Sequence, residues 1–474
     1  MIATLALLST LAAAAPLRAA PCIRLLKPGT VLRGDTRVCP GKYRVTDARE
    51  QGVLVVAVSG IRLDLSGVVL ESGDSIPANF AGVGVVSRGV DSLTVTGGTI
   101  RGYRFGIRIS GGKGHEVRGS VLSGSRNQAL QSADSTYAVA DELDIFRPEA
   151  VEGYGAGLLL EDVDGAVVAE VTAERAQNGI VLHRVRRAIV ADNVVSRNSG
   201  WGISLWRAAQ NTIVRNRAEW NVRCVGRTYR RGCQAAALLL RDASDSNLVA
   251  DNDLRHSGTG FLLSGHRPGL APSNGNLVLR NDATGAYRSA FVATFSWGNR
   301  FIDNRADSAE YGFRLSHSSG TVVRGSTALG TRVAAIAVEH GSDDDLSANV
   351  IIGGRDGIVL SAPQDGGPAS RGHLVSDNVL ARLARGVVLE RSAAVKLRGN
   401  LFDGDEDALV SDAAASDAEV QGNVFLRSTG FFVRAAELDA GGNYWGASDP
   451  EATREKLAGR VLLTPWYPAS QAGF

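Results

Sequence analysis

Two histidines stand at matching positions in two copies of one short motif. The copies Gly312-Phe-Arg-Leu-Ser-His and Ala335-Ile-Ala-Val-Glu-His begin 23 residues apart, so His317 and His340 are equivalent. Successive copies of a stacked repeat pair as neighbouring strands, about 4.8 Å apart. We therefore expect the two imidazoles to be neighbours, with Glu339 beside them and Arg314 one strand pleat away.

These four residue types suit proton transfer on an acidic sugar. An arginine neutralises the sugar carboxylate, a neutral histidine removes the adjacent proton, and a second group protonates the leaving oxygen or the opposite sugar face. Two stacked histidines also disfavour each other's charging, which keeps one of them available as a base. The predicted catalytic residues are His317, His340, Glu339 and Arg314. Two alternatives stay open: a divalent-metal site built from the same side chains, and a solvated polar ladder with no chemistry.

A second cluster combines arginine with tryptophan. Counting from the small residue that begins each repeat places Arg184, Arg207 and Arg241 in one column, close to Trp206. Arginine can bind acidic sugars and tryptophan can stack on pyranose rings; the alternative is that both simply cover apolar surface. Glu161 and Asp162 lie one or two repeats away and would weaken the case if they paired with these arginines. The predicted substrate-binding residues are Arg184, Arg207, Arg241, Trp206, Tyr287, Arg288 and Tyr311.

The repeat itself predicts the fold. Small residues that begin an apolar strand recur every 22–24 residues over most of the chain, from Gly82 to Gly430. A second column is asparagine, which tolerates the left-handed backbone of a tight corner. Its members are Asn193, Asn216, Asn252, Asn281, Asn304, Asn349, Asn378, Asn400 and Asn423, with Ser326 where another Asn is expected. No amphipathic helical pattern persists and no leucine-rich frame is present. We predict an all-β, right-handed parallel β-helix of about 14–16 rungs.

The resemblance to a known superfamily rests on the GIxLxx…IxxNxxxxN rungs and on the closing Gly442-Asn-Tyr-Trp-Gly446…Asp449-Pro450. The chain resembles the pectate-lyase-like right-handed β-helix superfamily, in particular its NosD-like and alginate-epimerase-like bacterial proteins, over roughly residues 53–465. The resemblance implies the fold more strongly than a chemistry, because this fold carries lyases, hydrolases, epimerases and non-catalytic proteins. The Asp-Pro-His-Asp motif of alginate epimerases and the motif set of polygalacturonases are absent from the sequence.

The chain ends and the cysteines predict export. Residues 1–20 resemble a signal peptide, with an apolar stretch too short to span a bilayer. Cys22 with Cys39, and Cys224 with Cys233, form two local pairs typical of disulfides in an oxidising compartment. We expect residues 21–59 to form a disulfide-stapled N-terminal cap, residues 60–446 the β-helix, and residues 447–474 a capping tail. The expected location is periplasmic or extracellular.

The function expected from these patterns is a lyase or epimerase acting on an acidic, uronate-containing polysaccharide. The alternatives are a non-catalytic β-helix that binds glycan or protein, and a NosD-like periplasmic metal-handling protein. The last is disfavoured because copper(I) prefers Met and free Cys, and Met1 is the only methionine. A net charge of +2 without a long basic run argues against nucleic acid as a partner. We expect a monomer without a stable membrane anchor, and no motif indicates a cofactor beyond an open possibility of a divalent cation.

Overall fold

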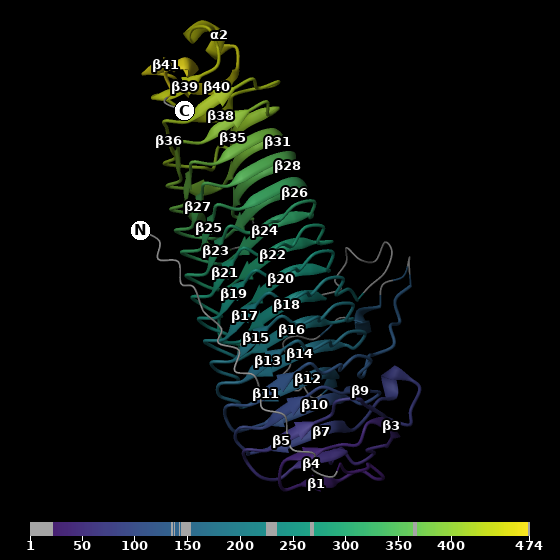
Figure 1. Cartoon of the computed structure of the whole chain (residues 1–474). Coiled ribbons are helices and arrows are strands. Elements are labelled where there is room, and N and C mark those ends of the chain that lie inside the picture. Colours follow the sequence, from purple (N-terminus) through teal and green to yellow (C-terminus); the bar gives the residue numbers. More distant parts are fainter. Residues whose placement is uncertain are drawn as a thin grey trace.

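The chain winds into a tall parallel coil, with its first rungs at one end and its C-terminal strands at the other (Figure 1). The computed structural model describes residues 22–133, 136, 138–141, 143, 153–223, 235–265, 270–363 and 367–472. Each turn contributes one strand to each side, and every pairing in the two long sheets is parallel with the next turn. The predicted all-β, right-handed parallel β-helix is confirmed.

The largest sheet has 21 strands and carries the candidate sites on its outer face. Its strands are β1 (Thr30–Leu32), β4 (Leu54–Val56), β7 (Val83–Arg88), β10 (Phe105–Ser110), β12 (Ala156–Glu161), β14 (Asn178–His183), β16 (Trp201–Trp206), β18 (Ala236–Arg241), β20 (Thr259–Ser264), β22 (Ser289–Thr294), β24 (Tyr311–Ser316), β26 (Thr327–Glu339), β28 (Val350–Ser361), β31 (Val379–Glu390), β34 (Leu401–Asp403), β35 (Asp407–Ser411), β37 (Val424–Leu426), β38 (Val433–Asp439), β39 (Asn443–Trp445), β40 (Leu457–Leu462) and β41 (Trp466–Pro468).

The second sheet has 15 short strands on another side of the coil. They are β2 (Thr36–Arg37), β5 (Arg62–Asp64), β8 (Thr94–Thr96), β11 (Glu116–Arg118), β13 (Val167–Ala169), β15 (Ile189–Ala191), β17 (Thr212–Val214), β19 (Leu248–Ala250), β21 (Leu277–Leu279), β23 (Arg300–Ile302), β25 (Val322–Arg324), β27 (Asp345–Ser347), β30 (Leu374–Ser376), β33 (Lys396–Arg398) and β36 (Glu419–Gln421). The third side starts as β3 (Gly41–Arg44), β6 (Val68–Glu71) and β9 (Thr99–Arg101), and continues as single bridges such as Arg217 with Asp253. A small pair, β29 (Ser370–Arg371) with β32 (Ser392–Ala393), completes the strands.

The strands at both ends of the β-helix pair with the neighbouring rungs. The predicted cap already contributes strands, because β1, β2 and β3 pair with β4, β5 and β6 of the next rung. The Cys22–Cys39 disulfide is present there, which confirms the predicted staple. At the other end the pairing continues into the predicted tail, through β40 and β41 and past the short helix α2 (Pro450–Arg454). Cys224, Cys233 and the predicted signal peptide lie outside the described residues.

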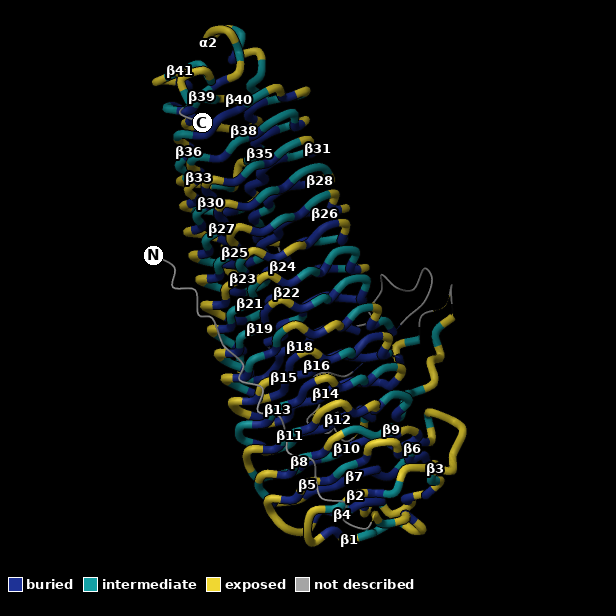
Figure 2. The backbone as a smooth tube through the Cα atoms, in the orientation of Figure 1, coloured by how far each residue is buried: buried dark blue, intermediate teal, exposed yellow. Residues whose placement is uncertain are grey.

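The inside of the coil is filled by alternating apolar residues. Buried residues, dark blue in Figure 2, recur on every turn of the coil. In β24, Phe313 and Leu315 point inward and are fully buried. Identical positions of successive rungs touch, so Phe291 stacks on Phe313 with ring centroids 4.9 Å apart. Burying one such side chain contributes about 1.5–3 kcal/mol, which explains why most inward positions of the strands are Val, Ile, Leu or Phe.

The predicted asparagine column forms a continuous buried ladder. Where two asparagines follow each other, the side-chain Nδ2 of one donates to the Oδ1 of the next, as from Asn252 to Asn281 at 2.9 Å. Ser326 fits the column, because its Oγ accepts the backbone N–H of Asn304 at 3.1 Å. A second ladder, which the sequence reading missed, runs through Asn211, Asn247, Asn276 and Asn299 at another corner. These ladders pair the backbone groups that a tight corner would otherwise leave unsatisfied.

No helix among the described residues is long and apolar enough to cross a bilayer.

Candidate functional site

The predicted catalytic residues meet on the outer face of the large sheet. We call Arg314, Ser316, His317, Glu339 and His340 the C-terminal cluster. Ser316 of β24 pairs directly with Glu339 of β26, which brings the two following histidines side by side. Their ring centroids lie 4.6 Å apart. The predicted neighbourhood of the two histidines is confirmed.

His317 is held as part of an aromatic stack at the corner that follows β24. Its ring lies flat on Phe295, with centroids 4.4 Å apart, and tilts against His340 on the other side. The Ser316 Oγ lies 3.0 Å from His317 Nδ1. Both histidines have positive φ, 51° and 54°, because the chain turns out of the strand at this position. His317 remains partly exposed, so its ring edge can reach a ligand on the outer face.

His340 is less accessible than its neighbour. Only 5% of the residue is exposed, and its Nδ1 lies 2.6 Å from the carbonyl oxygen of Pro368. That contact requires an N–H at Nδ1, because a carbonyl only accepts. The insert between β28 and β29 therefore covers His340, and among the two imidazoles His317 is the one placed to act on a bound molecule.

Arg314 and Glu339 form the charged part of the cluster. The Arg314 Nη2 lies 3.2 Å from the Glu339 Oε2 across the two strands, and the guanidinium lies 5.4 Å from the ring centroid of Tyr311. Both charged side chains are partly exposed, at 36% and 26%. A guanidinium oriented in this way presents its remaining N–H groups to a carboxylate in solution.

Three of the predicted substrate-binding residues, Tyr287, Arg288 and Tyr311, lie near the start of the same strands, at the end opposite to the histidines. Tyr311 begins β24, and its backbone N–H donates to the carbonyl of Arg288. Tyr287 is 39% exposed, and its carbonyl accepts a hydrogen bond of 2.8 Å from Arg332. The length of β24 separates Tyr311 from His317, so Tyr311 contacts the C-terminal cluster through Arg314.

The predicted arginine column is partly wrong. The register pairs Trp206 with Arg241, so the rung begins at Ala237 and not at Ala236. Arg241 therefore stands beside Trp206 on the strand face, and Asp242 takes the corner position after Arg207. The prediction that Arg241 lies in one column with Arg184 and Arg207 is therefore wrong by one residue.

The two corner arginines are each matched by an acid. Arg184 binds Asp162 through two hydrogen bonds of 2.5 and 2.7 Å, and the Arg207 Nε lies 2.6 Å from the Asp242 carboxylate. The pairing raises the pKa of Arg184 and lowers that of Asp162. Asp162 and Asp242 therefore occupy part of each guanidinium, and an acidic ligand would bind Arg184 through the Nη1 group that does not contact Asp162.

The structure adds three residues to this region that were not among the predicted site residues: Arg108, Glu161 and His183. We call Arg108, Glu161, His183, Arg184, Trp206 and Arg241 the central cluster. The Glu161 Oε1 lies 3.1 Å from His183 Nδ1, His183 stacks on Trp206 at 4.6 Å, and the Arg241 guanidinium lies 3.8 Å over the Trp206 ring. The hydrogen bonds from His183 and Arg108 lower the pKa of Glu161 to about 2, against the effect of burial. The sequence placed Glu161, His183 and Trp206 at the same position of successive rungs, and the strand register adds Arg241 to them.

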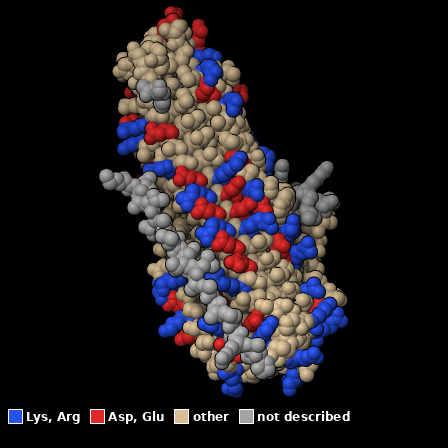
Figure 3. Space-filling view, in the orientation of Figure 1, with Lys and Arg blue, Asp and Glu red and all other residues tan. Residues whose placement is uncertain are grey.

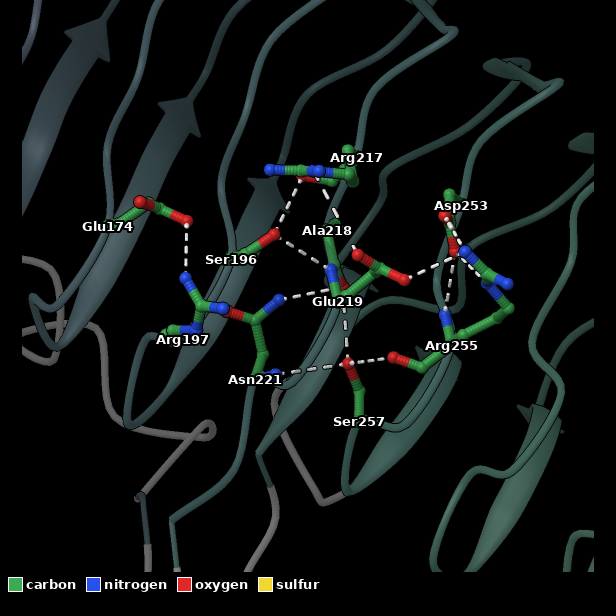
Figure 4. A network of polar contacts seen from close by, with 10 residues as sticks. All are labelled: Glu174, Ser196, Arg197, Arg217, Ala218, Glu219, Asn221, Asp253, Arg255 and Ser257. Carbon is green, nitrogen blue, oxygen red and sulfur yellow. Dashed lines mark hydrogen bonds and ion pairs between the residues drawn. The ribbon is translucent and has the colours of Figure 1, made fainter.

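Arginines elsewhere on the coil follow the same rule of paired charges. Figure 4 shows a corner of the third side where Arg255 reaches both Glu219 and Asp253, at 2.9 and 2.7 Å. At another corner Arg280 binds Asp251 through two hydrogen bonds. Blue and red side chains accordingly interleave across the middle of the face in Figure 3 instead of separating by sign. The surface is zwitterionic, which fits the net charge of +2.

Two histidines without a predicted role belong to the second asparagine column. The Nδ1 of His115 accepts the backbone N–H of Leu93 at 3.3 Å, and the Nδ1 of His373 that of Asp344 at 3.4 Å. Each ring nitrogen thus takes the place of an asparagine Oδ1. The His373 Nε2 lies 2.9 Å from the Ser370 Oγ and its Nδ1 lies 3.2 Å from the Asp344 Oδ2, but all three residues are buried. Their role is structural.

We expect His373→Asn to be tolerated better than His373→Ala. Alanine leaves the Asp344 N–H and the Ser370 hydroxyl unpaired in a buried site, at a cost of about 1–3 kcal/mol. Asparagine is the residue that other rungs use here and restores an acceptor. Urea unfolding of both variants measures the difference. Equal losses would show that His373 acts only by filling space.

Among the described residues, no three His, Cys, Asp or Glu side chains are grouped to hold a metal ion.

Comparisons with known proteins agree on architecture. The family described as "Periplasmic copper-binding protein (NosD)" matches residues 69–282, less than half of the chain. A search of the curated proteins finds no match. Among solved structures, the mannuronan C-5 epimerase AlgE6 A-module of Azotobacter vinelandii is 12% identical, covers 85% of this chain and 91% of its own, and has a TM-score of 0.46.

Two further structures are similar at the same level. The periplasmic alginate epimerase AlgG is 12% identical over 73% of this chain and 76% of its own, with a TM-score of 0.42. The Yersinia enterocolitica family 28 exopolygalacturonase is 12% identical over 82% of this chain and 74% of its own, with a TM-score of 0.41. At these identities nothing about substrate or activity follows for this chain. From its own strand pairing, the chain is a right-handed parallel β-helix protein, and its residues 69–282 are similar to the family described as "Periplasmic copper-binding protein (NosD)".

Proposed function

We propose that this protein is an exported carbohydrate-active β-helix protein that acts on an acidic polysaccharide as a lyase or epimerase, with the C-terminal cluster as its reaction centre. One observation carries the proposal. A histidine, a guanidinium and a carboxylate converge at partly exposed positions of two adjacent strands, with Arg314 and Glu339 3.2 Å apart and His317 packed at the end of the same column.

The cluster supplies the groups that the first chemical step needs. Removing the proton next to a sugar carboxylate places negative charge on that carboxylate, and Arg314 lies on the sheet face to neutralise it. His317 provides the base, and His340 positions its ring by stacking. Glu339 orients Arg314 through their ion pair of 3.2 Å.

Export rests on the predicted signal peptide and on the Cys22–Cys39 disulfide, since disulfides persist in oxidising compartments. Periplasmic or extracellular location gives the protein access to acidic polysaccharides. The proposed partner is therefore the polysaccharide itself, with a monomeric protein in solution.

A substrate screen tests the proposal. The mature protein is incubated with pectate, alginate, hyaluronan, chondroitin and heparin in D₂O. Ultraviolet absorbance reports unsaturated ends, and NMR reports deuterium incorporated at the carbon next to the carboxylate. We expect one polymer to respond, and His317→Asn to lower its turnover by about tenfold or more.

Asparagine suits the test because it tolerates the positive φ of this position. His256→Asn is the matched control, since His256 also has a positive φ, 56°, and lies in neither cluster. If no polymer gains deuterium or unsaturated ends, the non-catalytic alternative holds, and binding of the same polymers by calorimetry distinguishes a glycan-binding protein from one that recognises another partner.

A further inference from the structure

We propose that the central cluster is a second proton-transfer centre for acidic polysaccharide, with His183 as its base, Glu161 as the residue that positions the base, and Arg184 as the carboxylate-binding group. The inference rests on the proposed function for its substrate class, but on separate residues. His183 and Glu161 end the adjacent strands β14 and β12, where the register pairs them directly.

Glu161 is held in its ionised form by converging donors. Its Oε2 accepts from the Arg108 Nη2 at 3.0 Å and from the Ser110 hydroxyl at 3.3 Å, and its Oε1 lies 3.1 Å from His183 Nδ1. An ionised carboxylate can only accept, so the contact with His183 requires the proton on Nδ1. The basic lone pair of the imidazole is thereby assigned to Nε2, as in enzymes whose base is oriented by a third group.

The ring of His183 has one fixed orientation. It lies nearly parallel to Trp206, with ring centroids 4.6 Å apart and an interplanar angle of 24°, and Arg241 covers the other side of the tryptophan. A base that does not rotate loses little entropy when the reacting atom arrives. Only 8% of the His183 side chain is exposed, so water competes weakly for its Nε2.

Arg184 lies where the substrate carboxylate has to bind. Its Nη1 is 2.6 Å from His183 Nε2, while its Nε and Nη2 bind Asp162. Arg184 is 39% exposed at the corner and accessible from solution. A sugar carboxylate that binds Arg184 replaces the Nη1–Nε2 contact and places the proton on its neighbouring carbon beside Nε2. Base and charge acceptor are thus adjacent, which is the arrangement that such proton abstraction needs.

The chemical step balances within the site and solvent. The proton moves from the carbon next to the carboxylate to Nε2, and its electron pair delocalises into the carboxylate, whose charge Arg184 neutralises. Reprotonation from water on the opposite face gives the epimer. Alternatively, the pair forms a carbon–carbon double bond, the glycosidic oxygen leaves with the bonding electrons and takes a proton from water. In both cases Nε2 returns its proton to solvent.

The position of the second centre suits a polymer. The paired residues Glu161, His183, Trp206, Arg241, Ser264, Thr294, Ser316 and Glu339 form one outward column that joins the two clusters. Five strand steps separate β14 from β24, a distance of about 24 Å at strand spacing. Trp206, Arg241 and Ser264 of this column are buried, so a polysaccharide chain along the helix axis would contact the two clusters at their exposed residues, Arg184 and Arg314.

The test uses the His317→Asn protein, because its remaining activity isolates the second centre. We expect His183→Gln in this background to lower the residual deuterium exchange or elimination by about tenfold or more. Glu161→Gln keeps the shape and an acceptor but loses the charge. Because the imidazolium then lacks its carboxylate, the acidic limb of the pH–rate profile should move to lower pH, an effect that a merely structural role would not produce. His256→Asn in the same background is the control.

The outcomes separate the two proposals. If the wild-type protein is inactive on every polymer, the proposed function fails and this inference with it. If the wild type is active but His317→Asn leaves no residual activity, or if that activity is unchanged by His183→Gln, the second centre is overturned while the proposed function stands. Far-ultraviolet circular dichroism of each variant establishes that it is folded. Should His183→Gln fail to fold, the pH–rate profile of Glu161→Gln decides alone.

Discussion

Replacing Asn281 by alanine should destabilise the protein by about 3–5 kcal/mol, among the largest effects available from a single polar side chain. Its Oδ1 accepts the backbone N–H and the side-chain Nδ2 of Asn252, at 3.0 and 2.9 Å. Its Nδ2 donates to the Val249 carbonyl and to the Asn304 Oδ1, at 3.0 and 3.1 Å. Alanine would leave the Asn252 N–H buried without its acceptor, and it would remove one partner from buried groups on the two neighbouring rungs. Urea unfolding followed by circular dichroism measures the loss.

Asn281→Ser is the matched control. Ser326 shows that a serine in this column still accepts a backbone N–H from the preceding rung. We therefore expect serine to recover a part of the lost stability. Hydrogen exchange should localise the damage, with faster exchange at the corners on both sides of residue 281. A loss below about 1 kcal/mol for alanine would mean that water enters the corner and replaces the amide.

The stacking period made a large part of this structure predictable. In a coil that adds one rung per repeat, a fixed offset in sequence becomes a contact in space. The offset of the two copies that contain His317 and His340 therefore predicted their contact, and the spacing of the Asn column predicted a ladder from Asn193 to Asn423. The Cys22–Cys39 pair followed from the even cysteine count and its short spacing.

Counting residues from rung to rung gave the wrong register where an insert precedes a strand, because the first residue of that rung is ambiguous. The insert after Arg223 ends in three consecutive alanines, and each of them satisfies the requirement for a small residue at the start of the strand. Starting from Ala236 instead of Ala237 moved Arg241 by one position and concealed its contact with Trp206. A one-residue slip exchanges the two faces of a strand, so the central cluster could not be assembled from sequence.

The contacts made by the inserts could not be predicted from the sequence either. Their lengths are visible in the sequence, but the direction in which each one docks is not. Arg223 is one example. It is 2% exposed, and its Nη2 donates a hydrogen bond of 2.8 Å to the Oε1 of Gln128, a residue of a different insert. The insert that covers His340 with Pro368 is a second case. Such contacts depend on packing across many rungs, which no local pattern encodes.

Asp405 should make the stability of the protein fall as pH rises, and Asp405→Asn should abolish that fall. The residue is completely buried; its Oδ1 accepts the Leu383 N–H at 2.8 Å, and its Oδ2 has no hydrogen-bond partner among the described residues. Burial raises the pKa of Asp405 to about 7. The folded protein therefore keeps this proton between about pH 4 and pH 7, where the unfolded chain has already lost it.

The sign follows from that difference in bound protons. The contribution of Asp405 to the free energy of unfolding is fully present below the pKa that this carboxyl has in the unfolded chain. It is lost as the pH rises through the pKa of Asp405 in the folded protein. The loss amounts to at most about 4 kcal/mol by pH 8. The neutral amide of Asp405→Asn carries no such penalty, so the variant should match the wild type near pH 4 and exceed it by about 1–4 kcal/mol at pH 8.

Urea unfolding at a series of pH values measures both curves, with Asp303→Asn as the control because Asp303 is an exposed carboxylate at a corner. The control should follow the wild-type curve. The free energy of unfolding of Asp405→Asn and of the wild type could instead change with pH in parallel. That result would mean that the Asp405 carboxylate is solvated in the folded state. If the curves diverge only above pH 4, the corner beneath β31 holds an acid in its neutral form, and the coil is most stable on the acidic side of neutrality.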